Sequence, residues 1–393
     1  MEYPNYVDII IDRLENAGYE AYIVGGGLRD SLLKRNPNDF DIATSAKPEE
    51  TLSLFSDMRT IPTGLKHGTV TVLCQGEPIE ITTFRVDGEY SDSRHPESVS
   101  FTSNICEDLA RRDFTINAMA YNKKRGFVDP FGGVDDLKSG ILRAVRDPEL
   151  RMKEDALRIM RALRFSAQLG FAIEENTKKA LGTMKEGLAN ISGERLGVEL
   201  AKLVTAPYPK RPVEIMCELG ISKYILRDYI PSERLLDTLS KLPPDFTQRL
   251  ACLLWDCDSE TITLILSSMK YSNEQKRAVK NVCAAKCFPQ ICNDADVRRF
   301  MLRFGKEADA AAKLRAMLSE DDALTQERLE SVRKNEFCDG IASLSLGGDE
   351  LVKMGIRGKD IGLALSAMLE LVTEYPSKNT KDELCDFVKR KYL

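Results

Sequence analysis

Two aspartates in one short stretch, preceded by a run of glycines, are the residues of this sequence best suited to chemistry. Asp39 and Asp41 are separated by a single phenylalanine, and three glycines occupy positions 25–27. Alternate side chains of a strand point to the same face, so the two carboxylates would lie together, as ligands of a divalent metal ion do. Glycines let a ligand approach the backbone, and a helix after them would direct free N–H groups at an anion. The pairing predicts phosphoryl or nucleotidyl transfer.

Each motif has an ordinary structural explanation when it stands alone. Glycine runs are usually turns, and acids often alternate along the exposed face of a strand. The stretch matches neither G-x-G-x-x-G nor G-x-x-x-x-G-K-[ST], the two common phosphate-binding patterns. The close spacing of the glycines and the aspartates therefore carries the argument for a site.

The composition is that of a globular protein large enough for two or three domains. The 393 residues are 43% hydrophobic and 30% charged, and no apolar run approaches the roughly 20 residues of a membrane helix. No secretory signal is visible, and the ten scattered cysteines are typical of reduced thiols, so a cytoplasmic location is expected. Two histidines exclude a histidine-rich metal centre. The cysteines at 283, 287 and 292 lack a C-x-x-C pair, which disfavours zinc.

Charge is unevenly distributed along the chain. The formal net charge is −5, with a balance of −8 in residues 1–150 and +3 in residues 151–393. The negative net charge argues against a protein that coats nucleic acid without sequence preference. An acidic head on a mildly basic body is still compatible with local RNA binding. An ordinary solvated surface explains so small a difference equally well.

Periodicity predicts alternating helices and strands around the two motifs. We expect helices at 5–17, directly after the glycines, and at 48–55, and strands at 21–24, 67–73 and 78–85. Glu80 lies between two isoleucines in the last of these strands, so its side chain either faces the site of Asp39 and Asp41 or points outward. Residues 86–106 lack a clear period and predict a long polar loop that includes Arg94.

A second polar motif, R-R-D-F-T-I-N-A, occupies residues 111–118. Two arginines beside an acid and an amide could bind a triphosphate and a ribose, although the motif is equally compatible with the charged start of a helix. A short helix is expected at 134–137. From residue 148 onward no strand pattern appears, and helices continue to the end of the chain, one of them starting after Ser192 as its cap.

The expected helix at 151–170 carries four polar residues at a spacing of three. They are Asp155, Arg158, Arg161 and Arg164. Such pairs are usually surface ion pairs, but beside a nucleotide they could read a base. Asp155 would accept from the exocyclic amine of cytosine or adenine, and Arg158 would donate to the adjacent ring nitrogen. Guanine and uracil would present a carbonyl oxygen to the carboxylate, which disfavours both. Arg161 and Arg164 would hold phosphates or order Asp155.

The combined motifs resemble those of class II tRNA nucleotidyltransferases, the CCA-adding enzymes of the polymerase-beta superfamily, which are related to bacterial poly(A) polymerase. The matching strings are V-G-G-G-L-R-D, D-F-D-I-A-T, R-R-D-F-T-I-N-A-M-A, D-P-F-G-G-V-D-D-L, E-D-A-L-R-I-M-R-A-L-R-F and I-S-G-E-R-L, in family order from about residue 20 to 200. Residues 205–393 match in helical character alone. A third glycine at Gly27 and a leucine at position 28 are mild departures from the family pattern.

The resemblance implies a role for each candidate residue. Asp39 and Asp41 would hold Mg²⁺ ions, and Glu80 would be the third carboxylate, suited to deprotonating the primer 3′ hydroxyl, with Asp113 as the alternative. The nucleotide-contacting residues would be Gly26, Arg29, Arg112, Asp113, Asn117, Asp155, Arg158, Arg161 and Arg164, among which Asp113 and Asn117 would lie near the sugar.

The implied fold is α+β. A small mixed-sheet nucleotidyltransferase head (1–145) would precede a helical neck with the base-reading helix (146–205) and a helical body and tail that bind tRNA (206–393). The implied reaction is addition of C, C and A to tRNA 3′ ends from CTP and ATP, with no membrane partner and with the oligomeric state left open.

Several alternatives stay open at this point. Relatives that add CC alone shorten the loop before R-R-D, whereas here it is long and keeps Arg94. Relatives that add A alone are a further possibility. Poly(A) polymerases usually carry a basic C-terminal extension, and residues 389–391 (K-R-K) are brief for one. An inert RNA-binding protein on the same scaffold is the alternative of a different class.

Overall fold

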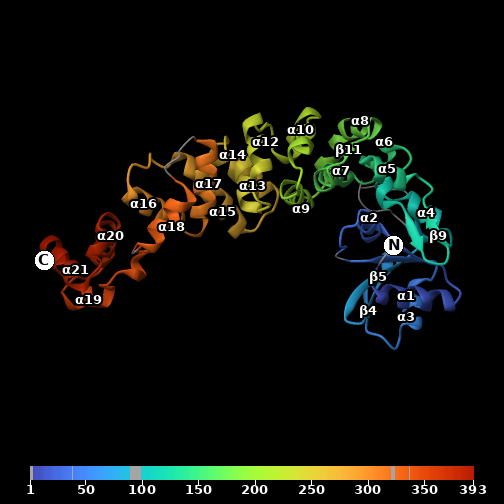
Figure 1. Cartoon of the computed structure of the whole chain (residues 1–393), viewed down its shortest axis with the longest axis horizontal. Helices are drawn as coiled ribbons and strands as arrows, with labels where there is room; N and C mark the ends of the chain where they lie inside the picture. Colours follow the sequence, from blue (N-terminus) through green and yellow to red (C-terminus); the bar gives the residue numbers. More distant parts are fainter. Residues whose placement is uncertain (1–2, 38, 89–98, 320–323, 336) are drawn as a thin grey trace. The chain divides into compact units, whose positions relative to one another are not determined.

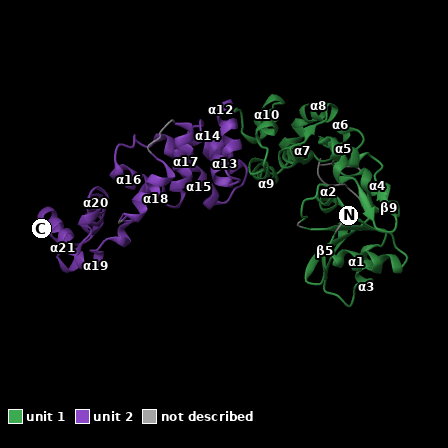
Figure 2. Ribbon diagram, in the orientation of Figure 1, with its two compact units in different colours: residues 1–230 green, residues 231–393 purple. Residues whose placement is uncertain are grey.

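The computed structural model describes residues 3–37, 39–88, 99–319, 324–335 and 337–393. These residues divide into two compact units, 1–230 and 231–393 (Figure 2). The predicted boundaries at 145 and 205 both lie within the first unit and stay predictions. Among the helices of the described residues, none is long and apolar enough to cross a membrane.

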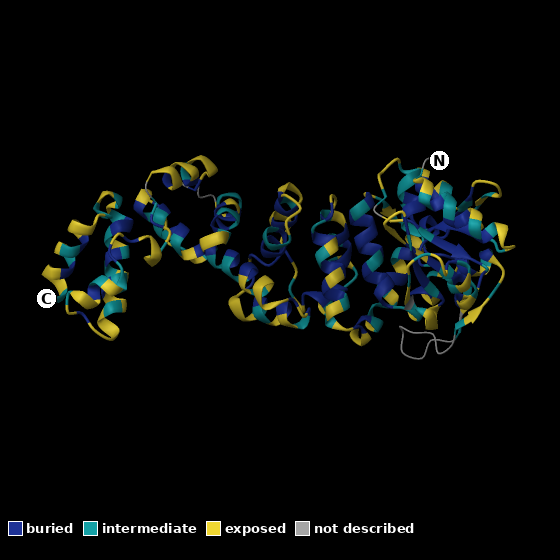
Figure 3. Cartoon of the chain, turned by 90° about the horizontal axis from the view of Figure 1, so that it is seen from below, coloured by how far each residue is buried: buried dark blue, intermediate teal, exposed yellow. Residues whose placement is uncertain are grey.

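The first unit is built on a mixed β-sheet, in which the described residues supply seven strands. In spatial order these strands are β3 (Thr60–Gly64), β4 (Thr69–Cys74), β5 (Glu77–Thr83), β2 (Asp41–Thr44), β1 (Ala21–Val24), β8 (Ala120–Asn122) and β9 (Gly126–Val128). The β2 and β5 strands are parallel, whereas β1 runs antiparallel to both β2 and β8. Strand β1 is buried along its whole length, as its unbroken apolar sequence predicts. Figure 3 shows buried residues inside the first unit, with exposed residues around them.

The first unit also contains helices, some of them beside this sheet and others extending away from it (Figure 1). They are α1 (Asn5–Asn16), α2 (Gly25–Leu32), α3 (Pro48–Leu54), α4 (Ile105–Ala110), α5 (Gly133–Ser139), α6 (Pro148–Glu154), α7 (Leu157–Leu169), α8 (Glu175–Thr183), α9 (Gly193–Val204), α10 (Lys210–Glu218) and α11 (Ser222–Ile225). The predicted apolar face of α1 is buried, including Val7 and Leu14 with no exposed surface. The expected α+β head with a helical remainder is confirmed.

The second unit is helical throughout its described residues. Its helices are α12 (Glu233–Lys241), α13 (Phe246–Leu253), α14 (Ser259–Ser268), α15 (Asn273–Cys283), α16 (Asp294–Phe304), α17 (Ala308–Leu318), α18 (Gln326–Lys334), α19 (Gly348–Lys353), α20 (Lys359–Glu374) and α21 (Lys381–Tyr392). Leu346, Met368 and Val388 belong to one buried cluster in the C-terminal part of this unit. The cysteines of the chain are free, so nothing covalent reinforces this packing among the described residues.

The expectation of one continuous helix over 151–170 is wrong. The chain forms two helices, α6 and α7, because Asp155 between them has an extended backbone, with φ −138° and ψ 101°. The Asp155 Oδ1 atom accepts a hydrogen bond from the Leu157 backbone N–H at 3.0 Å, which satisfies one of the free donors at the start of α7. Asp155, which the sequence predicts to read the base, therefore precedes the helix that carries the three arginines.

Four smaller expectations also need correction. The polar segment 86–106 contains an antiparallel pair of short strands, β6 (Arg85–Asp87) and β7 (Val99–Phe101), and Arg94 lies outside the described residues. The strand expected from residue 67 begins at Thr69, after a 3₁₀ turn. Ser192 precedes α9 as expected but makes no side-chain cap hydrogen bond. One short strand, β11 (Ala172–Ile173), lies in the region after residue 148 where no strand was expected, and it pairs in parallel with β10 (Ile141–Leu142).

Gly27 lies where α2 crosses the segment that leads into β2. A Cβ atom at this position would lie 2.5 Å from the Asp39 carbonyl oxygen and 3.2 Å from Cδ1 of Phe40. We expect Gly27→Ala to destabilise the first unit by about 1–3 kcal/mol, because the backbone carrying Asp39 must shift to relieve the overlap. Urea unfolding of the two proteins measures this difference.

Gly362 is the matched control, because it is also helical but has open space where a Cβ atom would lie. Gly362→Ala should leave the stability unchanged or raise it by up to about 1 kcal/mol. Equal stability of Gly27→Ala and the unsubstituted protein would contradict the close packing described for α2.

Candidate active site

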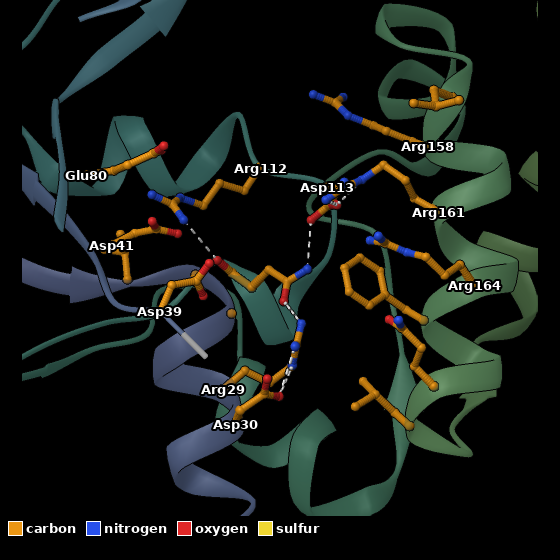
Figure 4. Close-up of a pocket in the computed structure, with 18 of the residues that line it drawn as sticks. Arg29, Asp30, Asp39, Asp41, Glu80, Arg112, Asp113, Arg158, Arg161 and Arg164 are labelled. Atoms are coloured by element: carbon orange, nitrogen blue, oxygen red, sulfur yellow. Dashed lines mark hydrogen bonds and ion pairs between the residues drawn. The ribbon is translucent and has the colours of Figure 1, made fainter. Parts of the chain in front are cut away.

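One cleft in the first unit collects every site residue singled out from the sequence. Its volume is about 890 Å³, and its lining includes the three predicted carboxylates, the glycine turn and the predicted arginines. Figure 4 shows Asp39, Asp41 and Glu80 together on one side, and Arg158, Arg161 and Arg164 along α7 on the other. A cleft of this size accommodates a small-molecule ligand such as a nucleotide.

The carboxylate side of the cleft is set by the pairing of two parallel strands. Asp41 begins β2 and lies opposite Glu80 of β5, while Asp39 lies two residues earlier, just before the strand. Burial and the charges of Asp39 and Glu80 raise the pKa of Asp41 to about 6, against the opposing effect of Arg112. Glu80 therefore faces the site, which decides between the two orientations that the sequence allowed.

These carboxylates could bind a divalent cation whose remaining ligands come from the substrate. Negative groups that repel one another are stabilised when a cation lies between them. The described residues contain no cluster of three His, Cys, Asp or Glu side chains that could hold a metal ion unaided. Mg²⁺ usually takes one or two protein carboxylates together with phosphate oxygens and water, so Asp39 and Asp41 are a sufficient pair of protein ligands.

The glycine turn forms the first turn of α2, because the helix begins at Gly25 itself. Gly25 has φ +72°, a conformation that glycine adopts readily, and a Cβ atom there would lie 3.3 Å from Oδ2 of Asp41 and 3.5 Å from Nη1 of Arg112. The absence of a side chain thus keeps the backbone close to the carboxylates. The free N–H groups of this turn lie at the edge of the same cleft, which Gly26 also lines.

The two adjacent arginines of the second motif share one buried partner. Asp108 of α4 pairs with Arg111 at 2.9 Å and with Arg112 at 3.0 Å, and its side chain is 1% exposed. The charges of both arginines outweigh the effect of burial and lower the pKa of Asp108. These ion pairs fix both guanidiniums at the cleft.

Asp113 connects the head to α7 through a chain of hydrogen bonds. Its Oδ2 atom accepts from Nε and Nη2 of Arg161 at 2.9 and 2.6 Å, and its Oδ1 atom accepts from the Asn117 amide at 3.0 Å. Asn117 in turn accepts from Nη1 of Arg29 at 2.8 Å. Burial raises the pKa of Asp113, but Arg161 and these hydrogen bonds outweigh it and lower the pKa to about 2.

This low pKa gives the stability of the protein a defined dependence on pH. A folded-state pKa of about 2 lies below the ordinary value of 3.8, so the contribution is fully present above about pH 4 and is lost as the pH falls toward 2. We expect Asp113→Asn to cost about 2 kcal/mol of unfolding free energy at pH 6 from this source. Urea unfolding at several pH values should show the difference shrinking as the pH falls from 5 to 3. A difference that stays constant over this range would contradict the assignment.

Arg158 lines the cleft but is held by neighbours other than Asp155. Its Nη1 atom donates to Glu154 at 2.7 Å and to the Arg151 carbonyl at 2.9 Å, and its Nη2 atom donates to the Arg111 carbonyl at 3.0 Å. The guanidinium is therefore fixed in the cleft wall. Asp155 instead has its Oδ2 atom 3.5 Å from Nη2 of Arg195, a residue that the sequence did not single out.

An aromatic ring organises the remaining arginines. Phe165 of α7 has guanidinium carbons of Arg29, Arg161 and Arg164 at 5.1, 5.3 and 4.2 Å from its ring centroid. Arg164 also pairs with Glu199 of α9 at 3.1 Å, with both side chains buried. Burial lowers the pKa of Arg164, and Glu199 partly offsets this effect.

The sequence held a recognisable signal for each of these missed residues. Glu199 is an acid on the otherwise apolar face of α9, Phe165 ends the matched string of α7, and Arg195 lies in the string I-S-G-E-R-L. Phe165 is an apolar residue of a helix with an apolar face, so the sequence alone does not suggest its contact with the arginines.

Comparisons with known proteins establish the family. Residues 21–143 match the sequence family described as "Poly A polymerase head domain", and residues 170–231 match "Probable RNA and SrmB- binding site of polymerase A". The CCA-adding enzyme of Lactobacillus helveticus (strain DPC 4571) is 37% identical over 388 residues, which cover 95% of this chain and 94% of that protein. The chain belongs to the CCA-adding enzyme family.

Other CCA-adding enzymes agree in sequence and in fold. That of Leuconostoc mesenteroides subsp. mesenteroides is 37% identical over 386 residues, covering 97% of this chain and 94% of that protein. The crystal structure of the Bacillus stearothermophilus CCA-adding enzyme in complex with CTP has a TM-score of 0.85 at 30% identity, and the match covers 99% of this chain and 98% of that one. These matches confirm the resemblance seen in the sequence motifs. CCA-adding enzymes are nucleotidyltransferases, and membership of this family implies that a divalent metal is used.

Proposed function

We propose that this protein adds C, C and A, one nucleotide at a time and without a nucleic-acid template, to the 3′ end of tRNA from CTP and ATP. The observation that carries the proposal is the convergence of the predicted carboxylates, the glycine turn and the predicted arginines on one cleft. Membership of the CCA-adding enzyme family and the CTP complex of the Bacillus stearothermophilus relative support it.

Asp39 and Asp41 would hold Mg²⁺ together with the phosphate oxygens of the substrate. When bound, such ions activate the attacking oxygen and stabilise the leaving pyrophosphate. Glu80 would accept the proton of the primer 3′ hydroxyl, since its exposed carboxylate faces Asp41 across the strand pair. Asp113 is less suited to this role, because its bonds to Arg161 and Asn117 keep its pKa near 2.

Arg29 and Arg112 would neutralise the triphosphate, helped by the N–H groups of the turn at Gly26. Both guanidiniums are held by acids, Asp30 at 2.9 Å and Asp108 at 3.0 Å, so their positions are set before the nucleotide arrives. Preorganised charges of this kind stabilise the developing charge without reorganisation during the reaction. The Asp113 and Asn117 pair would lie near the ribose.

Asp155 and Arg158 would read the base. An ionised carboxylate accepts hydrogen bonds and a guanidinium donates them, which matches the amine and ring nitrogen that cytosine and adenine share. The rigid hold on Arg158 supports this proposal, because a fixed donor discriminates between bases better than a mobile one. Arg161 and Arg164 would support the pair from the same helix.

The RNA partner would be the acceptor arm of tRNA. The match of residues 170–231 to an RNA-binding family region supports RNA contact by the helices that follow the head. We assign the head to 1–145, the neck to 146–205 and the tRNA-binding body and tail to 206–393. The free cysteines accord with a cytoplasmic location, which we also propose.

Incubation of the purified protein with tRNA that lacks its CCA end tests the proposal. With Mg²⁺ present, labelled CTP alone should add two residues, and CTP with ATP should add three that end in A. Addition of C alone or A alone would instead identify a relative of partial specificity, and a long A tract would identify a poly(A) polymerase. No incorporation under these conditions would refute the proposal.

A further inference from the structure

A second pocket, which we name the basic pocket, lies in the helical unit and is lined by residues of α14, α15 and α16. Its volume is about 560 Å³. Four cations line it, namely Lys276, Arg277, Lys280 and Arg303. Hydroxyl and amide groups supply the rest of its polar lining, from Ser259, Thr263, Ser267, Asn273 and Asn281. The described residues that line the pocket include no acid, so the pocket is positive although the whole chain has a net charge of −5.

Two lysines of the basic pocket have no acidic partner. Lys276 and Lys280 are both partly buried, and neither forms an ion pair with another described residue. Glu274, the one acid of α15, pairs instead with Lys306 at 2.7 Å. Like charges four residues apart on a helix destabilise it, and an anion between them removes this repulsion. The pocket therefore fits a negatively charged ligand.

Arg303 is positioned at the same pocket by a hydrogen bond. Its Nη1 atom donates to Oδ1 of Asn281 at 3.1 Å, and Nδ2 of Asn281 donates to the Phe304 carbonyl at 3.1 Å. The backbone thus orients the amide that holds the guanidinium. Because Arg303 is exposed, other donors of its guanidinium can reach a ligand in the pocket.

The lining favours the phosphate backbone of RNA over unpaired bases. Phosphate oxygens accept hydrogen bonds from lysine, arginine, serine, threonine and asparagine side chains, which are the polar residue types present here. Unpaired bases are bound by stacking on aromatic rings, and no aromatic side chain occurs among the described residues of the lining. Lys276 and Lys280 lie one turn apart on α15, about 6 Å along its axis, and a row of cations suits a polyanion better than one small anion.

We propose that the basic pocket binds the phosphate backbone of a base-paired arm of the tRNA substrate. The inference rests on the proposed function and deepens it, because it assigns RNA-binding residues to the second unit, outside residues 170–231, which match the RNA-binding family region. Phosphate contacts of this kind position the RNA without reading its sequence.

Binding of the full-length protein to labelled tRNA that lacks its CCA end, measured over a range of KCl concentrations, tests the inference. Each phosphate contact contributes about 0.9 to the slope of log Kd against log salt concentration. The double variant Lys276→Gln, Lys280→Gln should therefore lower this slope by about 2 and raise the Kd for tRNA at least about tenfold at about 0.15 M KCl. The Kd for CTP should stay unchanged, and in C addition the KM for tRNA should rise while kcat stays the same.

Two further variants control for the loss of side chains and for the change in net charge. Lys276→Arg, Lys280→Arg keeps both charges and should bind tRNA with the Kd and slope of the unsubstituted protein. Lys241→Gln, Lys334→Gln removes two exposed lysines of the same unit that lie outside the pocket lining, and it should also leave the Kd and slope unchanged.

An unchanged Kd and slope in Lys276→Gln, Lys280→Gln would overturn the inference and leave the pocket to a partner other than RNA. An equal change in Lys241→Gln, Lys334→Gln, or an equal rise in the Kd for CTP, would also overturn it. Failure of the proposed function would appear separately, as tRNA binding by the unsubstituted protein without incorporation of C or A.

Discussion

Replacement of Asp39 by alanine is expected to reduce nucleotidyl transfer to tRNA at least about a thousandfold, because a metal ion contributes several kcal/mol of transition-state stabilisation. Asp39 is the exposed residue just before β2, so removal of its side chain should leave the buried core intact. The initial rate of labelled C addition to tRNA lacking its CCA end measures the effect. Asp41→Asn should give a loss of similar size.

Asp135→Ala provides the control for this loss. Asp135 is an acid of the same head, on α5, with a side chain that is 87% exposed, and it does not line the cleft. This variant should retain the full rate. Substantial activity in Asp39→Ala, or an equal loss in Asp135→Ala, would contradict the metal-binding role of Asp39.

The second large effect concerns the choice of base. A site built to hydrogen-bond a substrate can reject a mismatched one by about 10⁴, and we expect Asp155→Asn to reduce the preference for C and A over U and G at least about a hundredfold. An amide both donates and accepts, so it can face the carbonyl oxygen of uracil or guanine without repulsion. The measurement is incorporation from an equal mixture of the four nucleoside triphosphates, read from the sequences of the product 3′ ends.

Glu149→Gln is the matched control for this variant. Glu149 is an exposed acid on α6, in the same segment as Asp155 but outside the cleft lining. Its products should have the same 3′ ends as those of the unsubstituted protein. An unchanged base preference in Asp155→Asn would remove the carboxylate from base reading.

The carboxylate and glycine side of the candidate site was predictable, because its residues are close together in the sequence. The strict two-residue period of a strand places Ile79 and Ile81 on one face and Glu80 on the other, whichever strand pairs with it. The glycines directly follow β1 and Asp41 begins the neighbouring strand β2, and α2 joins the two strands, so their proximity follows from a short connection. What the sequence could not give was the parallel register that sets Asp41 opposite Glu80.

The interruption between α6 and α7 could not be predicted from periodicity. The apolar residues of 151–169 continue without a glycine or proline, and Gly170 follows them, so the pattern predicts one helix that ends there. A tertiary contact lies at this interruption. Ala156 follows the extended Asp155 and is buried against Gly187, whose added Cβ atom would lie 2.9 Å from that of Ala156. A contact between residues 31 positions apart has no local signature.

Some acidic partners of the arginines could likewise be expected from the sequence, and others could not. Asp108 pairs with Arg111 and Arg112 at spacings of three and four, which a helical sequence allows one to expect. The Asp113–Arg161 pair joins residues separated by 48 positions, and Arg164 finds Glu199 on a different helix. These pairs determine where the arginines lie in the cleft, and only the folded chain reveals them.

Asp39 and Asp41 are proposed to hold a divalent ion within reach of a nucleotide triphosphate. Titration with Mn²⁺ in the presence of CTP measures this, as the loss of the free-ion electron paramagnetic resonance signal beyond the loss that CTP causes without protein. The unsubstituted protein and Asp135→Ala should show such additional, saturable Mn²⁺ binding, and Asp39→Ala should lose it. Additional Mn²⁺ binding that is equally strong in Asp39→Ala, or absent from the unsubstituted protein, would contradict the metal-binding role of Asp39 and Asp41.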